Sequence, residues 1–230
     1  MEFHHSERNF ANSKIKLSLN TSLKNLPHKT IERLSQYRRA LLLVHASGKT
    51  HIFSHEIAKI IHITPVQVRR DIMLIGYTGT LRKGYNVKEL IDLIGQIIDS
   101  EKGLKVGVVG VGNLGRAIIN YFSGKRTKLS IVAVFDNNPG KIGKKYSGVT
   151  CYNIDDLDEI VKKEDIRIGI MTVPAEQSPF IAEKLVKSGI KGILNFTPKP
   201  VNVPKDIYLE EYDMITSLEK IAFFVKTHAS

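Results

Sequence analysis

The stretch that decides the fold runs from Leu104 to Asp136. It reads LKVGVVGVGNLGRAIINYF over residues 104–122 and LSIVAVFD over residues 129–136. An apolar run of strand length is followed by a Gly-rich turn, a helix, a second apolar run and an acidic residue. This order supplies the full context that a dinucleotide-binding fingerprint requires. The sequence therefore predicts a strand–helix–strand unit with a nucleotide site at its Gly-rich turn.

Each glycine of the turn has a physical role. Gly110 makes the tight turn, Gly112 lets a pyrophosphate approach the backbone, and Gly115 lets the helix pack closely on the strand. The pyrophosphate would face backbone N–H groups at the positive end of the helix dipole. The predicted contacts at this turn are Gly110, Val111, Gly112, Asn113, Leu114 and Gly115.

The acid at the end of the second strand predicts the choice of nucleotide. Asp136 stands where a carboxylate accepts hydrogen bonds from the ribose hydroxyls of adenosine. It would repel a 2′-phosphate, which favours NAD(H) over NADP(H). Two alternatives stay open on this pattern, a turn that only packs and a coenzyme A site, because coenzyme A domains share this architecture.

Composition limits the class of protein. The chain has 230 residues, of which 42% are hydrophobic, as expected for one large or two small globular domains. It contains no apolar run long enough to span a membrane and no signal-peptide pattern, so we expect a cytoplasmic protein. Cys151 is the only cysteine, which excludes an intramolecular disulfide and a cysteine-based zinc cluster. We expect no metal site, and we interpret His4 and His5 as part of a solvated tail.

The positive charge is concentrated in the N-terminal half. Residues 27–85 carry ten Lys and Arg against three Asp and Glu, whereas residues 104–230 carry eighteen against fourteen. A strongly basic segment beside a nearly balanced one indicates a polyanion-binding module on a separate domain. We therefore expect a flexible extension over 1–26, a DNA-binding domain over 27–101, a nucleotide-binding domain over 104–212 and a C-terminal helix over 213–230.

The basic segment has the element order of a winged helix-turn-helix. Helices are predicted over 27–46 and 54–61, and a third begins at Thr64, whose side chain caps it, with Pro65 at its first position. A basic hairpin over 80–87 would form the wing. The third helix would enter the major groove of DNA, with its side chains Val66, Val68, Ile72 and Ile75 on the core face. The predicted DNA contacts are Thr64, Gln67, Arg69, Arg70, Arg82, Lys83 and Tyr85.

Specific base contacts follow from two of these residue types. Gln can pair bidentately with adenine, and Arg can pair bidentately with guanine. The alternative for Arg69 and Arg70 is a solvated helix face. Three features favour DNA binding over a solvated helix face: the capped start of the helix, its break at Gly76 and the basic wing.

After Asp136, strands and helices alternate, which predicts a parallel sheet with right-handed crossovers. Strands are expected over 149–152, 166–171 and 190–194, with helices over 154–163 and 175–188. Ligands of such sheets bind beyond the carboxyl ends of the strands. Two loops fall there and are candidates for the nicotinamide end, with plain turns as the alternative. Their candidate contacts are Thr172, Val173, Pro174, Asn195 and Phe196.

The last helix, expected over 213–227, is apolar over most of its surface. Ile215, Leu218, Ala222 and Val225 recur at helical spacing, so this helix must be buried. Because it follows a complete sheet, we expect it to pack on a partner subunit in a homodimer. The alternative is packing on its own domain.

Both halves together resemble the Rex family of redox-sensing transcriptional repressors, over residues 27–228. The matching stretches are residues 27–42, residues 64–76 around QVRRD, Gly84-Tyr85, residues 110–117, residues 172–174, residues 190–198 and the last helix. The resemblance implies an N-terminal winged helix-turn-helix, a C-terminal Rossmann domain and a domain-swapped C-terminal helix. It also implies a homodimer that binds palindromic operator DNA and releases it when NADH replaces NAD⁺.

The resemblance further implies a switchable contact between subunits, for which this chain has Arg39, Tyr121 and Asp213 in the matching places. The chain departs from the family pattern at three other positions. Met214 replaces an aromatic residue that often approaches the nicotinamide. Ile75 precedes Gly76 where an aromatic is usual, and Leu81 takes the place of a wing arginine. Met214 bears on the nicotinamide contact, and we expect Ile75 and Leu81 to give an operator sequence that differs from those of relatives.

Two other classes of protein remain as alternatives. An NAD-dependent oxidoreductase would need a general acid or base near the nicotinamide and usually a substrate domain. No histidine lies between His62 and His228, and little chain remains for substrate recognition, so we do not expect an enzyme. A regulator that binds coenzyme A is the third class.

Overall fold

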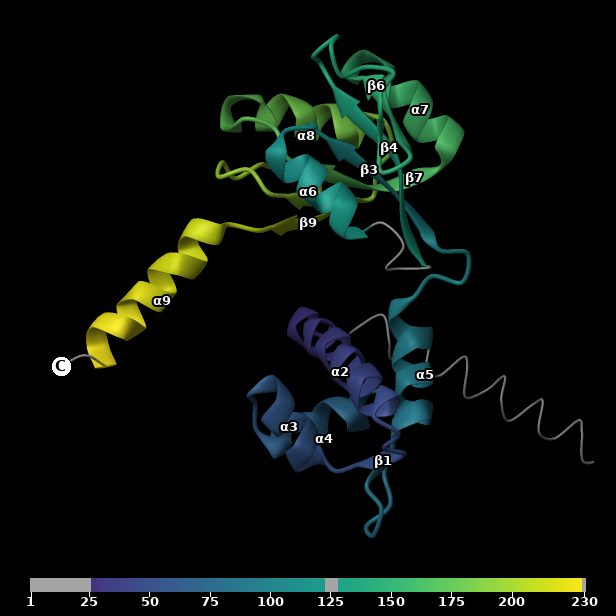
Figure 1. Ribbon diagram of the computed structural model, residues 1–230, viewed down its shortest axis with the longest axis vertical. Coiled ribbons are helices and arrows are strands. Elements are labelled where there is room, and N and C mark those ends of the chain that lie inside the picture. The colour runs from purple at the N-terminus through teal and green to yellow at the C-terminus, as the bar shows by residue number, and fades with distance from the viewer. Residues whose placement is uncertain (1–25, 123–127, 229–230) are drawn as a thin grey trace, which may run out of the picture. The chain divides into compact units, whose positions relative to one another are not determined.

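The computed structural model describes residues 26–122 and 128–228, and the chain divides into two compact units between Asp99 and Ser100 (Figure 1). Residues 1–25 of the predicted N-terminal extension, with His4 and His5, lie outside the described residues, whereas Leu26 packs against the core of the first unit. Within the described ranges, no helix has both the length and the apolarity that a membrane crossing requires.

The first unit is a small helical domain with a two-stranded sheet. Its helices enclose a core that includes Leu34, Tyr37, Ile57, Ile72 and Leu90. Its elements are α2 (His28–Ala46), β1 (His51–Ile52), α3 (Ser54–Ile61), α4 (Pro65–Leu74), β2 (Tyr85–Asn86) and α5 (Val87–Ile98).

Local sequence signals explain where these helices begin and end. The Thr64 hydroxyl accepts a hydrogen bond from the backbone N–H of Gln67 at 3.2 Å, which confirms the predicted cap of α4. Asn86 caps α5 in the same way. Gly76, with φ of +74°, follows α4 in a conformation that suits glycine.

The wing differs from the predicted hairpin. Its ladder is reduced to one bridge between Thr80 and Gly84, and β2 pairs with β1 in the register His51–Asn86. Residues 80–84 are a tight turn at the end of this small sheet.

The prediction of Val66 on the core face of α4 was also wrong, because this side chain is exposed while Val68, Ile72 and Ile75 are buried.

The second unit is built on a seven-stranded sheet of order β5-β6-β4-β3-β7-β8-β9. From β6 to β9 all neighbours are parallel, and β5 is antiparallel to β6. The chain order of the six parallel strands is 3-2-1-4-5-6, the doubly wound order of a Rossmann fold. The strands are β3 (Leu104–Val109), β4 (Leu129–Asp136), β5 (Lys145–Tyr146), β6 (Val149–Asn153), β7 (Ile166–Met171), β8 (Gly192–Asn195) and β9 (Tyr208–Glu211).

Helices cover both faces of this sheet (Figure 1). On one face α6 (Asn113–Phe122) packs Ile118 and Ile119 against Val106, Val108 and Val134. On the other face α7 (Leu157–Glu164) and α8 (Ser178–Lys187) pack against Val109, Ala133, Phe135 and Met171. Successive residues of a strand therefore contact helices on opposite faces of the sheet. The predicted fold class is confirmed.

The last helix, α9 (Met214–His228), leaves its apolar side chains exposed in the single chain. Asp213 caps it, accepting hydrogen bonds from the N–H of Ile215 at 2.9 Å and the hydroxyl of Thr216 at 2.8 Å. Leu218 is 65% exposed. The other exposed apolar side chains of α9 are Met214, Ile215, Ile221, Phe223, Phe224 and Val225.

Candidate functional site

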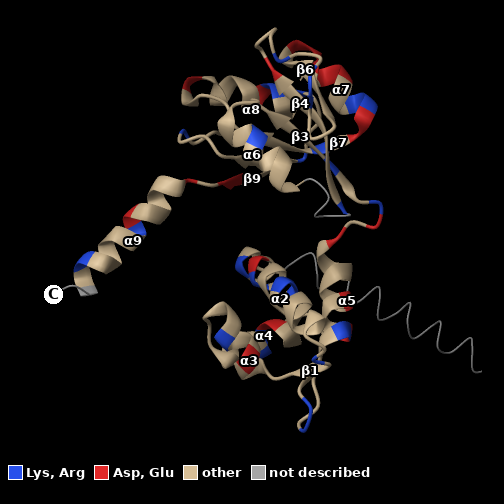
Figure 2. Cartoon of the chain, in the orientation of Figure 1, with Lys and Arg blue, Asp and Glu red and all other residues tan. Residues whose placement is uncertain are grey.

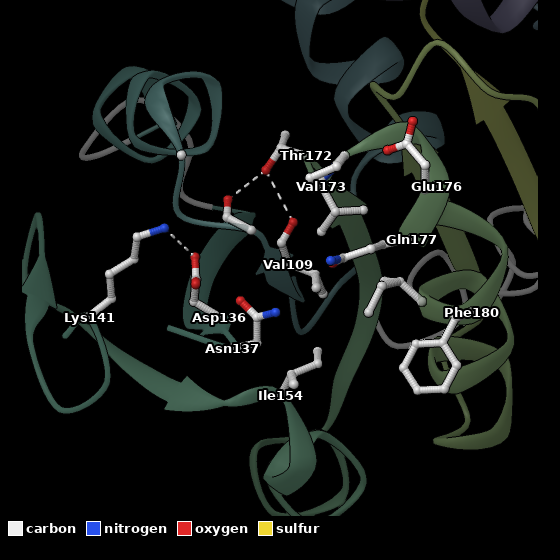
Figure 3. A pocket seen from close by; sticks show the side chains of 14 residues that line it. Val109, Asp136, Asn137, Lys141, Ile154, Thr172, Val173, Glu176, Gln177 and Phe180 are labelled. Carbon is white, nitrogen blue, oxygen red and sulfur yellow. Dashed lines mark hydrogen bonds and ion pairs between the residues drawn. The ribbon is translucent and has the colours of Figure 1, made fainter. Parts of the chain in front are cut away.

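A cavity of about 560 Å³ opens at the carboxyl ends of β3, β4 and β7 (Figure 3). It lies where the strand order reverses, which is the binding crevice of doubly wound sheets. Six predicted cofactor contacts line it, namely Gly110, Gly112, Asp136, Thr172, Val173 and Pro174. The cavity thus brings the Gly-rich turn, the acidic residue and the loop after β7 into one site.

Gly110 and Gly115 have the geometry of the turn and of the close helix–strand packing that the sequence assigned to them. Gly110 has φ of +97°, and a Cβ there would lie 2.6 Å from the carbonyl oxygen of Thr172. A Cβ on Gly115 would lie 2.0 Å from the carbonyl oxygen of Gly110, so only glycine permits this helix–strand approach. Gly112 has no neighbour within 4 Å of its Cβ position and faces open space. An open backbone beside the start of α6 fits a pyrophosphate.

Asp136 is buried and organises the loops at the end of β4. Its Oδ2 accepts hydrogen bonds from the N–H of Val111 and from Lys141 Nζ, both at 2.8 Å, and its Oδ1 accepts from the N–H of Asn138 at 3.0 Å. Burial disfavours its charged form, but these bonds outweigh burial and lower the pKa of the carboxyl. The side chain is therefore an ionised acceptor at neutral pH, as a ribose site requires.

The loop after β7 is fixed by Thr172. Its hydroxyl donates to the carbonyl oxygens of Gly110, at 2.7 Å, and Val109, at 3.1 Å, as Figure 3 shows. The predicted loop after β8 is different. The Asn195 amide is buried and bonds Thr197 and the carbonyl of Lys199, so it shapes the loop. The other six predicted cofactor contacts do not line the cavity. They are Val111, Asn113, Leu114, Gly115, Asn195 and Phe196.

Sequence reasoning missed eight of the fourteen residues that line the cavity. One of them, Val109, is the last residue of β3. The other seven share a position one to ten residues after a strand that ends at the crevice, and this is the signal that could have found them. They are Asn137, Lys141, Ile154, Glu176, Gln177, Phe180 and Ile181.

The structure offers no metal site among the described residues, where no group of three or more His, Cys, Asp or Glu side chains converges. Cys151 is buried in β6, and burial raises the pKa of its thiol.

The candidate nucleic-acid surface lies in the first unit. Arg69 and Arg70 are exposed on α4, and Arg69 Nη1 donates to Ser54 Oγ at 3.2 Å. Figure 2 shows basic residues at the tip of the turn before β2, where Arg82 and Lys83 are exposed. Tyr85, another predicted contact, is 9% exposed and belongs to the core of this unit.

A buried carboxylate joins α4 to α2. Asp71 accepts hydrogen bonds from Arg33 Nε at 2.6 Å, from Arg33 Nη2 at 2.8 Å and from the Tyr37 hydroxyl at 2.7 Å. Gln67 Nε2 donates to Asp71 Oδ1 at 2.9 Å. Burial disfavours ionisation, but these hydrogen bonds outweigh it and hold the pKa of Asp71 below its ordinary value. The cluster fixes α4 against α2 through an ionised side chain.

The three residues of the implied switch are exposed in the single chain. Arg39 lies on α2, Tyr121 lies near the end of α6, and the Asp213 carboxylate caps α9. All three are thus placed at surfaces.

A winged helix with exposed arginines, joined to a Rossmann domain with an open nucleotide crevice, defines a ligand-responsive transcriptional regulator. Two curated relatives are named "Redox-sensing transcriptional repressor Rex". The one from Anoxybacillus flavithermus is 37% identical over 92% of this chain and 100% of the relative. The one from Carboxydothermus hydrogenoformans is 40% identical over 87% of this chain and 97% of the relative. The chain belongs to the Rex family of redox-sensing transcriptional repressors.

Family models and solved structures agree with this assignment. Residues 101–199 match a CoA binding domain, and residues 25–72 match a putative DNA-binding protein N-terminus. The crystal structure of RSP in complex with beta-NAD+ and operator DNA is similar, with a TM-score of 0.82, 30% identity and coverage of 89% of this chain and 94% of that chain. RSP in complex with beta-NADH gives a TM-score of 0.80, with 30% identity over 89% of this chain and 96% of that chain. The relatives are repressors, so the chain is a regulator and not an oxidoreductase.

Proposed function

We propose that the chain is a homodimeric repressor that binds palindromic operator DNA and releases it when NADH replaces NAD⁺. The observation that carries this proposal is the crevice itself, where an open Gly112 and an ionised Asp136 line one cavity. The description of RSP, with NAD⁺ and operator DNA in one structure and NADH in another, supports the same ligands for this chain.

The cofactor would lie along the crevice. The N–H groups at the start of α6 would bind its pyrophosphate, and Asp136 would accept hydrogen bonds from the adenosine ribose. A reduced nicotinamide is neutral, whereas the oxidised ring is cationic. An apolar environment therefore accepts the reduced ring at a lower cost of desolvation.

The homodimer is proposed from α9. Seven of its large apolar side chains are exposed in the single chain. Packing this helix on a second copy would remove this apolar surface from water, which is the main driving force of association. A swapped α9 would also bring Asp213 to the partner subunit, where contacts with Arg39 and Tyr121 could differ between the two cofactor states.

The switch is a linkage between two ligands. If NADH prefers a dimer conformation that holds the two α4 helices at the wrong separation for DNA, each ligand must weaken the other by the same factor. A gel shift on a palindromic operator, with NADH added over an excess of NAD⁺, tests the proposal. We expect release of the DNA. Retention of the complex at saturating NADH would contradict the proposal.

The two arginines of α4 provide a test of the DNA interface. Arg69→Ala and Arg70→Ala should each weaken operator binding by about 1–3 kcal/mol if the side chain contacts a base. Fluorescence anisotropy of a labelled operator measures the change. Lys162→Ala on α7 is the control, because it removes one exposed positive charge from the other unit. Unchanged affinity in both arginine variants would show that α4 is not the reading helix.

Asp136 provides a test of cofactor choice. Asp136→Ala removes the charge that would repel a 2′-phosphate, so the ratio of NADH to NADPH affinity should fall. Competition between the two nucleotides, followed by NADH fluorescence, measures the ratio. Lys141→Ala is the matched variant: it leaves the carboxylate without its counter-charge, and the preference for NADH should be kept or increased. An unchanged ratio in Asp136→Ala would contradict the ribose assignment.

A further inference from the structure

The exposed side of α4 carries an apolar side chain where the sequence predicted a core residue. Val66 lies in the first turn of the helix and is 64% exposed. Met73, two turns further on, is 69% exposed. Together with Arg69, Arg70 and Leu74 they line a shallow groove on the surface of the first unit. Three of its five lining side chains are apolar, and the other two, both arginines, attract a polyanion.

The side chain of the neighbouring Gln67 is hydrogen-bonded to a buried residue of the same unit. Its Nε2 donates to Asp71 Oδ1, and Asp71 is fully buried. An ionised carboxylate only accepts hydrogen bonds, so the orientation of the Gln67 amide is fixed by chemistry as well as by geometry. The bond to Asp71 engages one of the two N–H groups of the Gln67 amide and ties this partly buried side chain to α2 through Asp71. Bidentate pairing with adenine would need the carbonyl oxygen and the second N–H to reach the base edge from that tethered position. Val66, which is 64% exposed, has no such tether.

Val66 has the chemistry that the major groove offers to apolar side chains. The C5 methyl group of thymine is the one apolar feature that a base pair displays there. Val66 lies at the start of a capped helix, which is the part of a recognition helix that contacts base edges. The arginines beside it can bind phosphates or guanine.

We propose that Val66, and not Gln67, makes the base contact at the start of α4, and that it recognises a thymine methyl group. The inference rests on the proposed function, in which α4 enters the major groove of operator DNA. Gln67 then acts as a positioning residue that ties the first turn of α4 to Asp71.

Removal of single methyl groups from the DNA tests this inference. An operator is first selected from random duplexes with the full-length protein and NAD⁺, and each thymine is then replaced in turn by deoxyuridine. We expect one thymine in each half-site at which this replacement weakens binding about fourfold, the effect of burying one methyl group. Val66→Ala should weaken binding to the thymine operator by a similar factor and should show no further loss with deoxyuridine at that position.

Gln67→Ala is the matched control in the same turn of the helix. It should keep the difference between thymine and deoxyuridine that the unmodified protein shows. Replacing adenines by purine, which lacks the 6-amino group, tests the competing role of Gln67. We expect that no purine replacement weakens binding of the unmodified protein without also weakening binding of Gln67→Ala. Thermal melting shows that each variant is folded.

Three results would overturn the inference. They are a protein insensitive to every thymine replacement, a Val66→Ala variant that keeps the sensitivity, and a purine effect that disappears in Gln67→Ala. In each of these cases the operator is still bound, so the proposed function stands. A full-length protein that selects no operator at all would overturn both.

Discussion

Replacing Gly112 with aspartate is expected to abolish the response to NADH while the protein remains folded and bound to its operator. No atom outside residues 111–113 lies within 4 Å of the Cβ position of Gly112, so the fold can accept a side chain there. The new carboxylate would occupy the space that a pyrophosphate needs and would repel its two charges. We expect NADH affinity to fall by at least about a hundredfold, or roughly 2.7 kcal/mol.

Titration of NADH fluorescence measures this loss, and operator binding with and without NADH measures the response. Gly112→Asn separates bulk from charge, because it has a similar shape without the charge, and it should lose less affinity. Gly115→Ala should behave differently, since its Cβ would lie 2.0 Å from the carbonyl oxygen of Gly110 and would disrupt the domain. A folded Gly112→Asp protein that binds NADH within threefold of the original affinity would refute the pyrophosphate site.

Replacing Asp71 with alanine is expected to destabilise the first unit by about 3 kcal/mol, as removal of one partner from a buried ion pair does. The substitution leaves the Tyr37 hydroxyl buried without its acceptor and Arg33 without its counter-charge. Urea unfolding followed by circular dichroism measures the change. Asp92→Ala is the control in the same unit, because its pair with Lys88 is exposed; it should cost no more than about 0.5 kcal/mol.

The effect of Asp71 should depend on pH in a defined direction. Its pKa is lower in the folded protein than in the unfolded chain. Its stabilising contribution is therefore complete above the ordinary aspartate pKa of about 3.9 and is lost as the pH falls through the lower, folded value. The stability difference between the original protein and Asp71→Ala should be constant near neutral pH and should narrow below about pH 4. A difference below 1 kcal/mol at pH 7 would contradict the role of the cluster.

The elements with strong local signals could be predicted from the sequence. The order of residues in Leu104–Asp136 predicts a strand, a Gly-rich turn, a helix and a second strand that ends on an acidic residue. The structure has β3, α6 and β4 there. The cap of α4 was predicted because Thr64 and Pro65 act within one turn of chain. The strand β5 was missed because two residues are too few to show a pattern, and the edge strand β9 was missed because its sequence, YLEE, does not alternate between apolar and polar residues.

The sites were harder to predict because they depend on contacts between distant residues. Val66 was placed in the core because its apolar side chain fits a helical period, yet the buried side of α4 contains the charged Asp71. That burial is possible only because Arg33 and Tyr37, more than 30 residues away, supply its hydrogen bonds. Phe180 and Ile154 likewise meet at the crevice only after the sheet has formed (Figure 3).

We propose that reduced cofactor and operator DNA bind to mutually exclusive conformations of one dimer. The most direct test is the affinity of the full-length protein for NADH, measured by fluorescence with and without saturating operator DNA. Linkage predicts that operator DNA weakens NADH binding by the same factor, about 5–150-fold, by which NADH weakens DNA binding. An NADH affinity that is the same with and without DNA would contradict the account.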